Sequence, residues 1–150
     1  MLTYRSCVVG VFLNAEGHVL VGRRQDREAW QFPQGGVELG ESEEEALYRE
    51  MKEEIGCSEF RILQKMPDVL SYDFPSALDR PIAKLYKGQT QRWFLCQFLP
   101  SHGPQLDQAV DEEFIETKWI LPPQAIDSVV EWKKSVYQSA LKHFSLLSFP

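Results

Sequence analysis

The sequence predicts a mixed α/β domain in which a β-sheet lies between helices. Apolar, β-type runs stand on both sides of a glutamate-rich helix, and a second amphipathic helix lies near the C-terminal end. This order of elements is typical of a mixed sheet that helices cover on its faces. With 150 residues, of which 43% are hydrophobic and 25% charged, the chain has the size and composition of one soluble globular domain, which we expect to span residues 1–150.

The first part of the chain predicts two strands joined by a tight turn. Residues 4–13 and 18–24 are mostly apolar, and residues 14–17 (NAEG) between them favour a turn, so a β-hairpin is expected. Residues 30–32 (WQF) read as a short strand, which leads into a turn at residues 33–36 (PQGG).

A helix is predicted from Ser42 to Gly56. Ser42 is a favourable N-cap, Glu45 three residues later completes a capping box, and Gly56 is a typical C-terminal stop. The apolar side chains of this helix share one arc, which is expected to pack against the sheet. They are Leu47, Tyr48, Met51 and Ile55.

Three carboxylates, those of Glu50, Glu53 and Glu54, occupy the adjoining arc of the same helix. Glu50 and Glu54 are four residues apart, where like charges destabilise an isolated helix, and the apolar neighbours would also strip them of water. A divalent cation would remove both penalties, and oxygen ligands suit magnesium, manganese or calcium better than zinc. The alternative is an ordinary solvated acidic face.

The second half of the chain predicts further strands and a last helix. Residues 60–70 are strand-like at their start and are then interrupted by Pro67. Further strands cover residues 92–99 and 116–121, and the helix covers residues 128–143. Two prolines at 122–123 separate the last strand from this helix. Residues 71–91 form a long irregular segment whose aromatic side chains argue against disorder, so a functional loop is expected.

The net charge of −6 is concentrated in the first helix. Residues 41–54 carry seven acidic and two basic side chains, a local balance of −5, which leaves the remainder of the chain near −1. This distribution fits a metal site and excludes the broad basic surface that duplex DNA requires. A small basic pocket for phosphates or for the end of a nucleic acid stays compatible with it.

The three cysteines, Cys7, Cys57 and Cys96, are widely spaced and form no CxxC pair. They favour a reducing cytoplasm over a disulfide framework or a cysteine zinc site. No apolar run approaches roughly 18 residues, and the N-terminal segment lacks the layout of a signal peptide. We therefore expect a cytoplasmic protein with no membrane partner.

The spacing of Gly35, Glu41 and residues 49–57 (REMKEEIGC) resembles the Nudix box, GX5EX7REUXEEXGU, in which U is a bulky aliphatic residue. Every fixed position matches, and the soft departure is Cys57 at the last U, a small apolar residue that can still pack. The resemblance to the Nudix family implies an α/β/α sandwich with a mixed β-sheet.

Nudix proteins hydrolyse a nucleoside diphosphate linked to another moiety, and most require magnesium or manganese. The resemblance implies that two or more Mg2+ (or Mn2+) ions are held by a set of oxygen ligands. The expected ligands are Gly35, through its backbone carbonyl, Glu50, Glu53, Glu54 and Glu113. Arg49 is expected to pair with Glu41 and hold the carboxylates in place, with direct phosphate contact as the alternative. The general base is expected to be a glutamate of the box, such as Glu53, or Glu113, whose neighbour Glu112 reads as a solvated residue.

The resemblance extends over most of the chain. QFPQGG, SYDFP, GQTQRWFL and VEWKKSVY look like the Nudix branch of bacterial RNA pyrophosphohydrolases and plant-type asymmetrical diadenosine tetraphosphate hydrolases. It implies a dinucleoside polyphosphate or nucleotide substrate, cut asymmetrically to ATP and AMP in the case of diadenosine tetraphosphate, or the 5′ end of triphosphate RNA, which would lose pyrophosphate. One alternative is a pyrophosphatase of mononucleotides, such as oxidised dNTPs or ADP-ribose. Another is a non-catalytic nucleotide sensor, which the intact box glutamates disfavour.

Candidate substrate-binding residues follow from the same resemblance. Arg23, Arg24 and Arg92 carry guanidinium groups suited to phosphate oxygens, although each has a surface salt bridge as its alternative. Trp132, with Lys133 beside it, is a candidate for stacking on a base, and core packing is its alternative. The expected set is completed by Gln34, Tyr72 and Tyr86.

Overall fold

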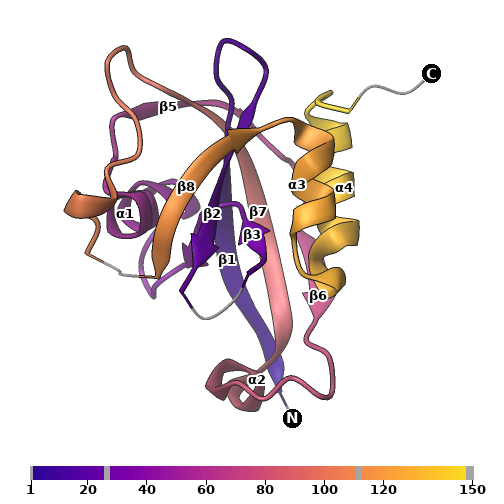
Figure 1. The fold of residues 1–150 in the computed structure, drawn as a ribbon. Coiled ribbons are helices and arrows are strands. Elements are labelled where there is room, and N and C mark those ends of the chain that lie inside the picture. The colour runs from indigo at the N-terminus through magenta and orange to yellow at the C-terminus, as the bar shows by residue number, and fades with distance from the viewer. Residues whose placement is uncertain (1, 26–27, 111–112, 148–150) are drawn as a thin grey trace.

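The computed structural model describes residues 2–25, 28–110 and 113–147 (Figure 1). The strands are β1 (Thr3–Phe12), β2 (Val19–Arg24), β3 (Trp30–Gln31), β4 (Gln34–Gly36), β5 (Phe60–Lys65), β6 (Leu70–Asp73), β7 (Tyr86–Phe98) and β8 (Phe114–Ile120). The α-helices are α1 (Glu43–Ile55), α2 (Pro81–Leu85), α3 (Pro122–Ser128) and α4 (Lys134–His143). Two short 3-10 helices are η1 (Leu106–Gln108) and η2 (Glu131–Lys133). In these described parts, no helix is long and apolar enough to cross a membrane.

Two sheets form the centre of the fold. The larger has five strands in the order β4-β1-β7-β5, with β6 also paired to β7. β1 and β7 run parallel, whereas β4, β5 and β6 pair antiparallel with their neighbours, so this sheet is mixed. The smaller sheet is antiparallel, in the order β3-β2-β8.

The helices cover opposite faces of the strands, as Figure 1 shows with α1 on one side and α3 and α4 on the other. Alternating strand residues supply the two faces, because successive side chains of a strand point in opposite directions. The core toward α1 contains Val8, Phe12, Leu20, Phe94 and Cys96. The core toward α3 and α4 contains Val9, Val11, Val19, Val21, Trp93 and Leu95. The predicted mixed sheet between helices is therefore confirmed.

Helix α1 has the predicted boundaries. The Ser42 Oγ accepts a hydrogen bond from the Glu45 N–H at 3.0 Å, and the Glu45 carboxylate accepts one from the Ser42 N–H at 2.9 Å. Gly56 ends the helix at a φ of 72°, a left-handed conformation that favours glycine. Its apolar arc is buried, since Leu47, Met51 and Ile55 have no exposed surface.

The predicted hairpin is wrong, although its turn is present. Asn14 Oδ1 accepts the N–H groups of Glu16 and His18, and Gly17 takes a φ of 79°. Beyond one bridge between Leu13 and Val19, the two strands enter different sheets. β1 has both of its edges occupied, by β4 and β7, so β2 pairs instead with β3 and β8.

The predicted irregular segment is also wrong over much of its length. It contains β6 apart from Leu70, all of α2, and the first half of β7, which begins at Tyr86 and not at residue 92. Polar residues such as Gln89 and Gln91 gave this stretch the appearance of a loop. Its backbone nevertheless pairs on both edges, with β1 on one side and β6 on the other.

The last helix is broken where one continuous helix was predicted. The two prolines occupy the first turn of α3, where a missing N–H costs nothing, so they start a helix before residue 128. The chain becomes extended at Val129, with φ −85° and ψ 159°, passes through η2, and resumes as α4. Because of this break, the side chains of Trp132 and Lys133 point in other directions than they would on one continuous helix.

Candidate active site

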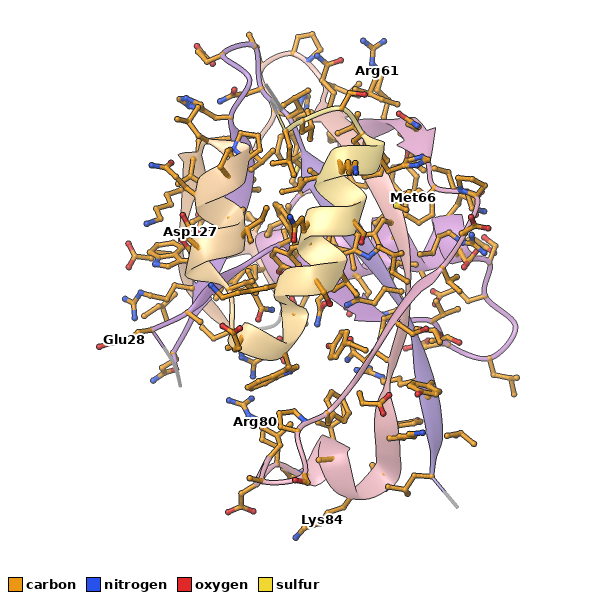
Figure 2. The ribbon with its side chains drawn as sticks, turned by 90° about the vertical axis from the view of Figure 1, so that its right-hand side faces the viewer. Glu28, Arg61, Met66, Arg80, Lys84 and Asp127 are labelled. Atoms are coloured by element: carbon orange, nitrogen blue, oxygen red, sulfur yellow. The ribbon has the colours of Figure 1, made fainter. Side chains whose placement is uncertain are left out.

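A cavity of about 660 Å3 lies where the N-terminal part of β1, β4, β6 and β7 meet the segment before α2 and the η2 turn. Its lining combines glycines, carboxylates, cationic side chains and aromatic rings. The polar and charged residues that line it are Arg5, Arg24, Gln31, Gln34, Glu50, Glu54, Asp79, Arg80, Gln89, Glu113 and Lys133. Figure 2 shows Arg80 pointing from the segment before α2 toward the connection between α3 and α4.

Glu54 is the buried carboxylate of this cavity, with 2% of its surface exposed. Its Oε1 accepts a hydrogen bond from the backbone N–H of Gln34 at 2.8 Å. Burial raises the pKa of Glu54 well above its usual value, and the negative charges of Glu113 and Glu50 raise it further, against the lowering effects of the Gln34 N–H and of Arg24. Two carboxylates of helix α1 and a third that directly precedes β8 therefore act on one another here.

The two glycines of β4 allow a close approach to this cluster. A Cβ atom on Gly35 would collide with the Glu50 carboxylate, and one on Gly36 would collide with the Arg5 guanidinium. Any other residue at either position would displace a charged side chain that lines the cavity. The predicted turn at residues 33–36 is therefore wrong: Gln34–Gly36 form the strand β4, which pairs with β1, and its two glycines leave room for Glu50 and Arg5.

Arg49 lies beside the cavity and organises the carboxylates from outside it. Its Nη1 donates to Glu50 at 2.8 Å and to Glu53 at 3.1 Å, and its Nη2 donates to the Gly36 carbonyl at 2.8 Å. The same guanidinium forms two hydrogen bonds to Glu41, at 2.7 and 2.9 Å. These bonds lower the pKa of the Glu41 carboxyl. Glu53 consequently faces Arg49 and does not line the cavity.

Within residues 2–25, 28–110 and 113–147, no three histidine, cysteine, aspartate or glutamate side chains are already arranged as metal ligands. Arg49 holds Glu50 and Glu53, and Gln34 holds Glu54, so each of these side chains has a protein partner. The donor set nevertheless fits a hard divalent cation. Glu50, Glu54 and Glu113 line one cavity and offer it carboxylate oxygens, the ligands that Mg2+ and Mn2+ prefer. Glu50, Glu54, Glu113 and the Gly35 carbonyl are the groups that could hold such an ion.

The structure brings five of the eight candidate substrate residues to the cavity and leaves three outside its lining. Those at the cavity are Arg24, Gln34, Tyr72, Trp132 and Lys133. Lys133 is 5% exposed, and its Nζ lies 5.9 Å from the centre of the Tyr72 ring. Arg24 pairs with Glu113 at 3.1 Å, so a cation stands next to a carboxylate of the cluster.

Arg23, Arg92 and Tyr86 do not line the cavity. Arg23 pairs with Glu116 at 2.8 Å on the smaller sheet. Arg92 pairs with Glu43 at 3.0 Å and donates to the carbonyls of Met66 and Pro67. The guanidinium groups of Arg23 and Arg92 are thus engaged in contacts within the protein. Asp111 and Glu112, on the acidic loop that precedes Glu113, lie outside the described residues.

Sequence reasoning missed several cavity residues, of which Arg5, Arg80 and Gln89 carry polar groups suited to phosphate. Gln89 lies on β7 next to the buried Gly88, and a polar residue within a run of buried residues is the signal that could have found it, whereas Arg5 on β1 stands between two exposed residues and gave no such signal. Arg80 carried no comparable signal, because the cavity wall formed by residues 78–82 depends on where α2 packs.

Comparisons with known proteins agree with this geometry. The NUDIX domain family matches residues 3–140 of the chain. An RNA pyrophosphohydrolase of Dinoroseobacter shibae is 40% identical over 149 residues, covering 96% of this chain and 93% of the relative. One of Gluconacetobacter diazotrophicus is 37% identical over 160 residues, covering 99% and 96%.

Solved structures share the fold. The Escherichia coli dihydroneopterin triphosphate pyrophosphohydrolase superposes with a TM-score of 0.68 at 23% identity, covering 94% of this chain and 99% of that chain. A Caenorhabditis elegans Ap4A hydrolase superposes with a TM-score of 0.65 at 16% identity, covering 94% and 99%. At these identities the likeness concerns the architecture alone.

Proposed function

Because the chain belongs to the Nudix family and is a hydrolase that acts on phosphoric anhydrides, we propose that it removes pyrophosphate from the 5′ end of triphosphate RNA. The observation that carries this proposal is the 37–40% identity to RNA pyrophosphohydrolases over nearly the whole chain. The cavity supports it, since it sets a carboxylate cluster beside cationic and aromatic side chains. We further propose that residues 1–150 act as one domain.

We propose that the carboxylate cluster holds divalent metal, as Nudix hydrolases generally use ions such as Mg2+. Glu50, Glu54, Glu113 and the Gly35 carbonyl are the proposed ligands, for two or more ions. When bound, such ions neutralise phosphate oxygens and favour attack by water in line with the leaving group. Arg49 and Glu41 act on the ligands by positioning Glu50.

The cationic residues of the cavity are proposed to receive the phosphate chain. Arg5, Arg80 and Lys133 come from β1, from the segment before α2 and from η2, so they surround the space in front of the carboxylates. Their charges offset those of a triphosphate, and guanidinium groups suit phosphate oxygens. Trp132 is proposed to stack on the first base, since it lines the same cavity beside Lys133.

In the proposed reaction, water attacks a phosphorus of the triphosphate. A new P–O bond forms, the bridging anhydride bond breaks, and pyrophosphate leaves from RNA that retains a 5′-monophosphate. We propose Glu113 as the general base that accepts the proton of the water, because it lines the cavity whereas Glu53 is turned toward Arg49.

Diadenosine tetraphosphate is the second proposed substrate, cut asymmetrically to ATP and AMP. QFPQGG and GQTQRWFL resemble the Nudix groups that act on either substrate, and they supply Gln34, Gly35, Gly36 and Gln89 to the cavity wall. Both substrates present a chain of phosphates attached to a nucleoside, so the same residues could receive either one. The buried free thiols Cys7, Cys57 and Cys96 support a cytoplasmic location, which we also propose.

The test is to incubate the protein with triphosphate-ended RNA, and separately with diadenosine tetraphosphate, under identical Mg2+ in 18O-water, and to separate the products by mass. The expected products are pyrophosphate with monophosphate-ended RNA, and ATP with AMP. Glu54→Gln, which keeps the shape of the side chain, serves as the inactive control. RNA that keeps its triphosphate would overturn the first proposal, and two molecules of ADP would overturn the second.

A further inference from the structure

A chain of side-chain amides lies along the wall of the cavity and includes Gln34, the residue whose backbone binds the buried carboxylate. The Tyr72 hydroxyl donates to Gln89 Oε1 at 2.8 Å. Gln91 Nε2 donates to Gln34 Oε1 at 2.9 Å and to Gln89 Oε1 at 3.3 Å. The backbone N–H of Gln34 in turn donates to Glu54. We refer to Gln34, Gln89 and Gln91 as the glutamine cluster.

The members of the glutamine cluster differ in their access to the cavity. Gln34 and Gln89 line it, whereas Gln91 does not and has no exposed surface. Gln91 is held on both sides of β7, opposite Cys7 of β1 and Leu70 of β6. A side chain in this place cannot touch a substrate. Any effect of Gln91 on a substrate must therefore pass through Gln34 and Gln89.

The burial of Gln91 lowers the stability of the fold. Its Oε1 has no hydrogen-bond partner among the described residues, and a buried polar atom without a partner destabilises the fold. An apolar side chain of the same length would avoid this cost. What the amide adds is its Nε2 group, which binds two other glutamines at once.

The direction of these hydrogen bonds sets the orientation of the outer amides. An amide NH2 group donates only, so Gln34 and Gln89 must both turn Oε1 toward Gln91. The Tyr72 hydroxyl reinforces this orientation at Gln89. The opposite ends of the two amides are their NH2 groups, which donate to no acceptor among the described residues. These are the ends that remain for a ligand of the cavity.

We propose that Gln91 is a positioning residue, which turns Gln34 and Gln89 so that their amide N–H groups face the phosphate oxygens of the substrate. Amide donors attract anionic phosphate, whereas the carbonyl oxygens of reversed amides would repel it. The inference rests on the proposed function to the extent that the cavity receives a phosphate chain. It assigns Gln34 and Gln89 as phosphate-binding residues and Gln91 as the residue that acts through them.

The test uses inorganic triphosphate with Mg2+ as the ligand and measures its dissociation constant by calorimetry. Gln91→Met keeps the length of the side chain and removes the donor. Loss of two oriented hydrogen bonds to a charged ligand is expected to weaken binding about tenfold to a hundredfold. The matched control is Gln97→Met, because Gln97 lies on the same strand but bonds to Arg61 away from the cavity, and it is expected to bind as the wild type does.

A double-mutant cycle separates positioning from a general structural effect. Gln34→Leu with Gln89→Leu removes both outer amides and keeps the backbone N–H that Glu54 accepts. In that background Gln91→Met should cause no further loss of triphosphate binding, since nothing is left for Gln91 to orient. The same loss in both backgrounds, or wild-type binding by Gln91→Met, would overturn the proposal, as would a wild-type protein that does not bind triphosphate.

Tyr72→Phe repeats the test with a smaller change, since it keeps the aromatic ring in the core and removes only the hydroxyl, should Gln91→Met fail to fold. It removes one donor to Gln89 Oε1 and should weaken triphosphate binding in the wild type but not in Gln89→Leu. An equal loss in both would contradict the proposal. A protein that shows this binding pattern and releases no pyrophosphate from RNA would refute the proposed function and support the inference about Gln91.

Discussion

Arg49 and Glu41 form a two-point ion pair, in which Nε donates to Oε2 at 2.7 Å and Nη2 donates to Oε1 at 2.9 Å. The pair joins helix α1 to the loop that follows β4, because Glu41 precedes the helix and also accepts the N–H of Glu38. On another edge of the guanidinium, Nη1 donates to Glu50 and Glu53. One planar group thus ties the loop to the carboxylates.

Arg49→Lys should therefore lower both stability and activity. A lysine ammonium keeps the charge but cannot reproduce the fork, so we expect the free energy of unfolding to fall by about 1–2 kcal/mol. Activity should fall more than tenfold, since Glu50 loses its fixed position. Denaturant unfolding and steady-state kinetics measure the two effects. Arg61→Lys, at an exposed arginine paired with Gln97, is the control and should change stability by less than about 0.5 kcal/mol.

Glu54→Gln should keep the fold and lose turnover on the order of 10²–10⁴-fold, because the charge disappears while the shape remains. The control is Glu44→Gln on the same helix, at a side chain that bonds to Lys65 on the surface. More than half of the wild-type activity in Glu54→Gln would contradict the proposed role of this carboxylate.

The raised pKa of Glu54 also predicts how metal-free stability depends on pH. The folded state binds the carboxyl proton more tightly than the unfolded chain does, so stability is greatest below the unfolded pKa and falls as pH rises through the folded pKa. Glu54→Gln should remove this fall. Melting temperatures in the presence of a chelator, measured from pH 5 to pH 9, test this, and parallel curves for the two proteins would contradict it.

Magnesium should raise the melting temperature of the wild type. An ion that binds the folded carboxylate cluster, and not the unfolded chain, stabilises the protein by about 2.7 kcal/mol at a hundredfold excess over its dissociation constant. Thermal unfolding in MgCl2 and in NaCl of equal ionic strength measures this difference. Glu54→Gln should show a smaller response. Equal curves in the two salts would argue against a metal site in the folded protein.

Trp132→Ala should raise KM for nucleotide substrates roughly fivefold to a hundredfold, given about 1–3 kcal/mol for the stacking of an aromatic ring on a base. Binding of inorganic triphosphate, which has no base, should stay unchanged. Trp30→Ala is the control, because Trp30 lies outside the cavity lining, over Lys118. Equal losses for both ligands would indicate that Trp132 supports the fold and not the base.

The thiols should resist reagents in the folded protein. Burial raises the pKa of Cys7 to about 11 and also raises that of Cys96. At pH 8 a thiol with a pKa near 11 is ionised to about 0.1%, and the thiolate is the reactive form. Alkylation followed by mass spectrometry should leave Cys7 and Cys96 unmodified until denaturant is added. Rapid labelling of either residue in the native protein would contradict this.

The features that the sequence predicted best are those encoded locally. The capping box of Ser42 and the stop at Gly56 depend on neighbours within one helix, so the boundaries of α1 could be predicted closely. The pairing partners of β2 could not be predicted, because they depend on which strands occupy the edges of β1. The same holds for Gln89 and Gln91, whose polar side chains concealed a strand paired on both sides.

The residues of the candidate site also divide into those that local sequence predicts and those that depend on distant strand pairing. The box glutamates follow from spacing along one helix, whereas the approach of Arg5 to Gly36 exists because β1 pairs with β4. Trp132 and Lys133 illustrate an intermediate case. Their residue types suggested a ligand, but their direction depends on the extended backbone at Val129, which helical periodicity does not reveal.

The parallel pairing of β1 with β7 has a consequence for the order in which the protein can fold. This ladder, from Thr3 with Tyr86 to Phe12 with Cys96, joins the beginning of the chain to its second half, and closing so large a loop is an entropic barrier that local contacts cannot lower. Helix α1 can form early because its signals are local. The cavity cannot form early, since Arg5 and Gln89 come together in the cavity wall only after β1 has paired with β7. During synthesis on the ribosome, the chain should therefore lack phosphate-binding capacity until β7 has emerged.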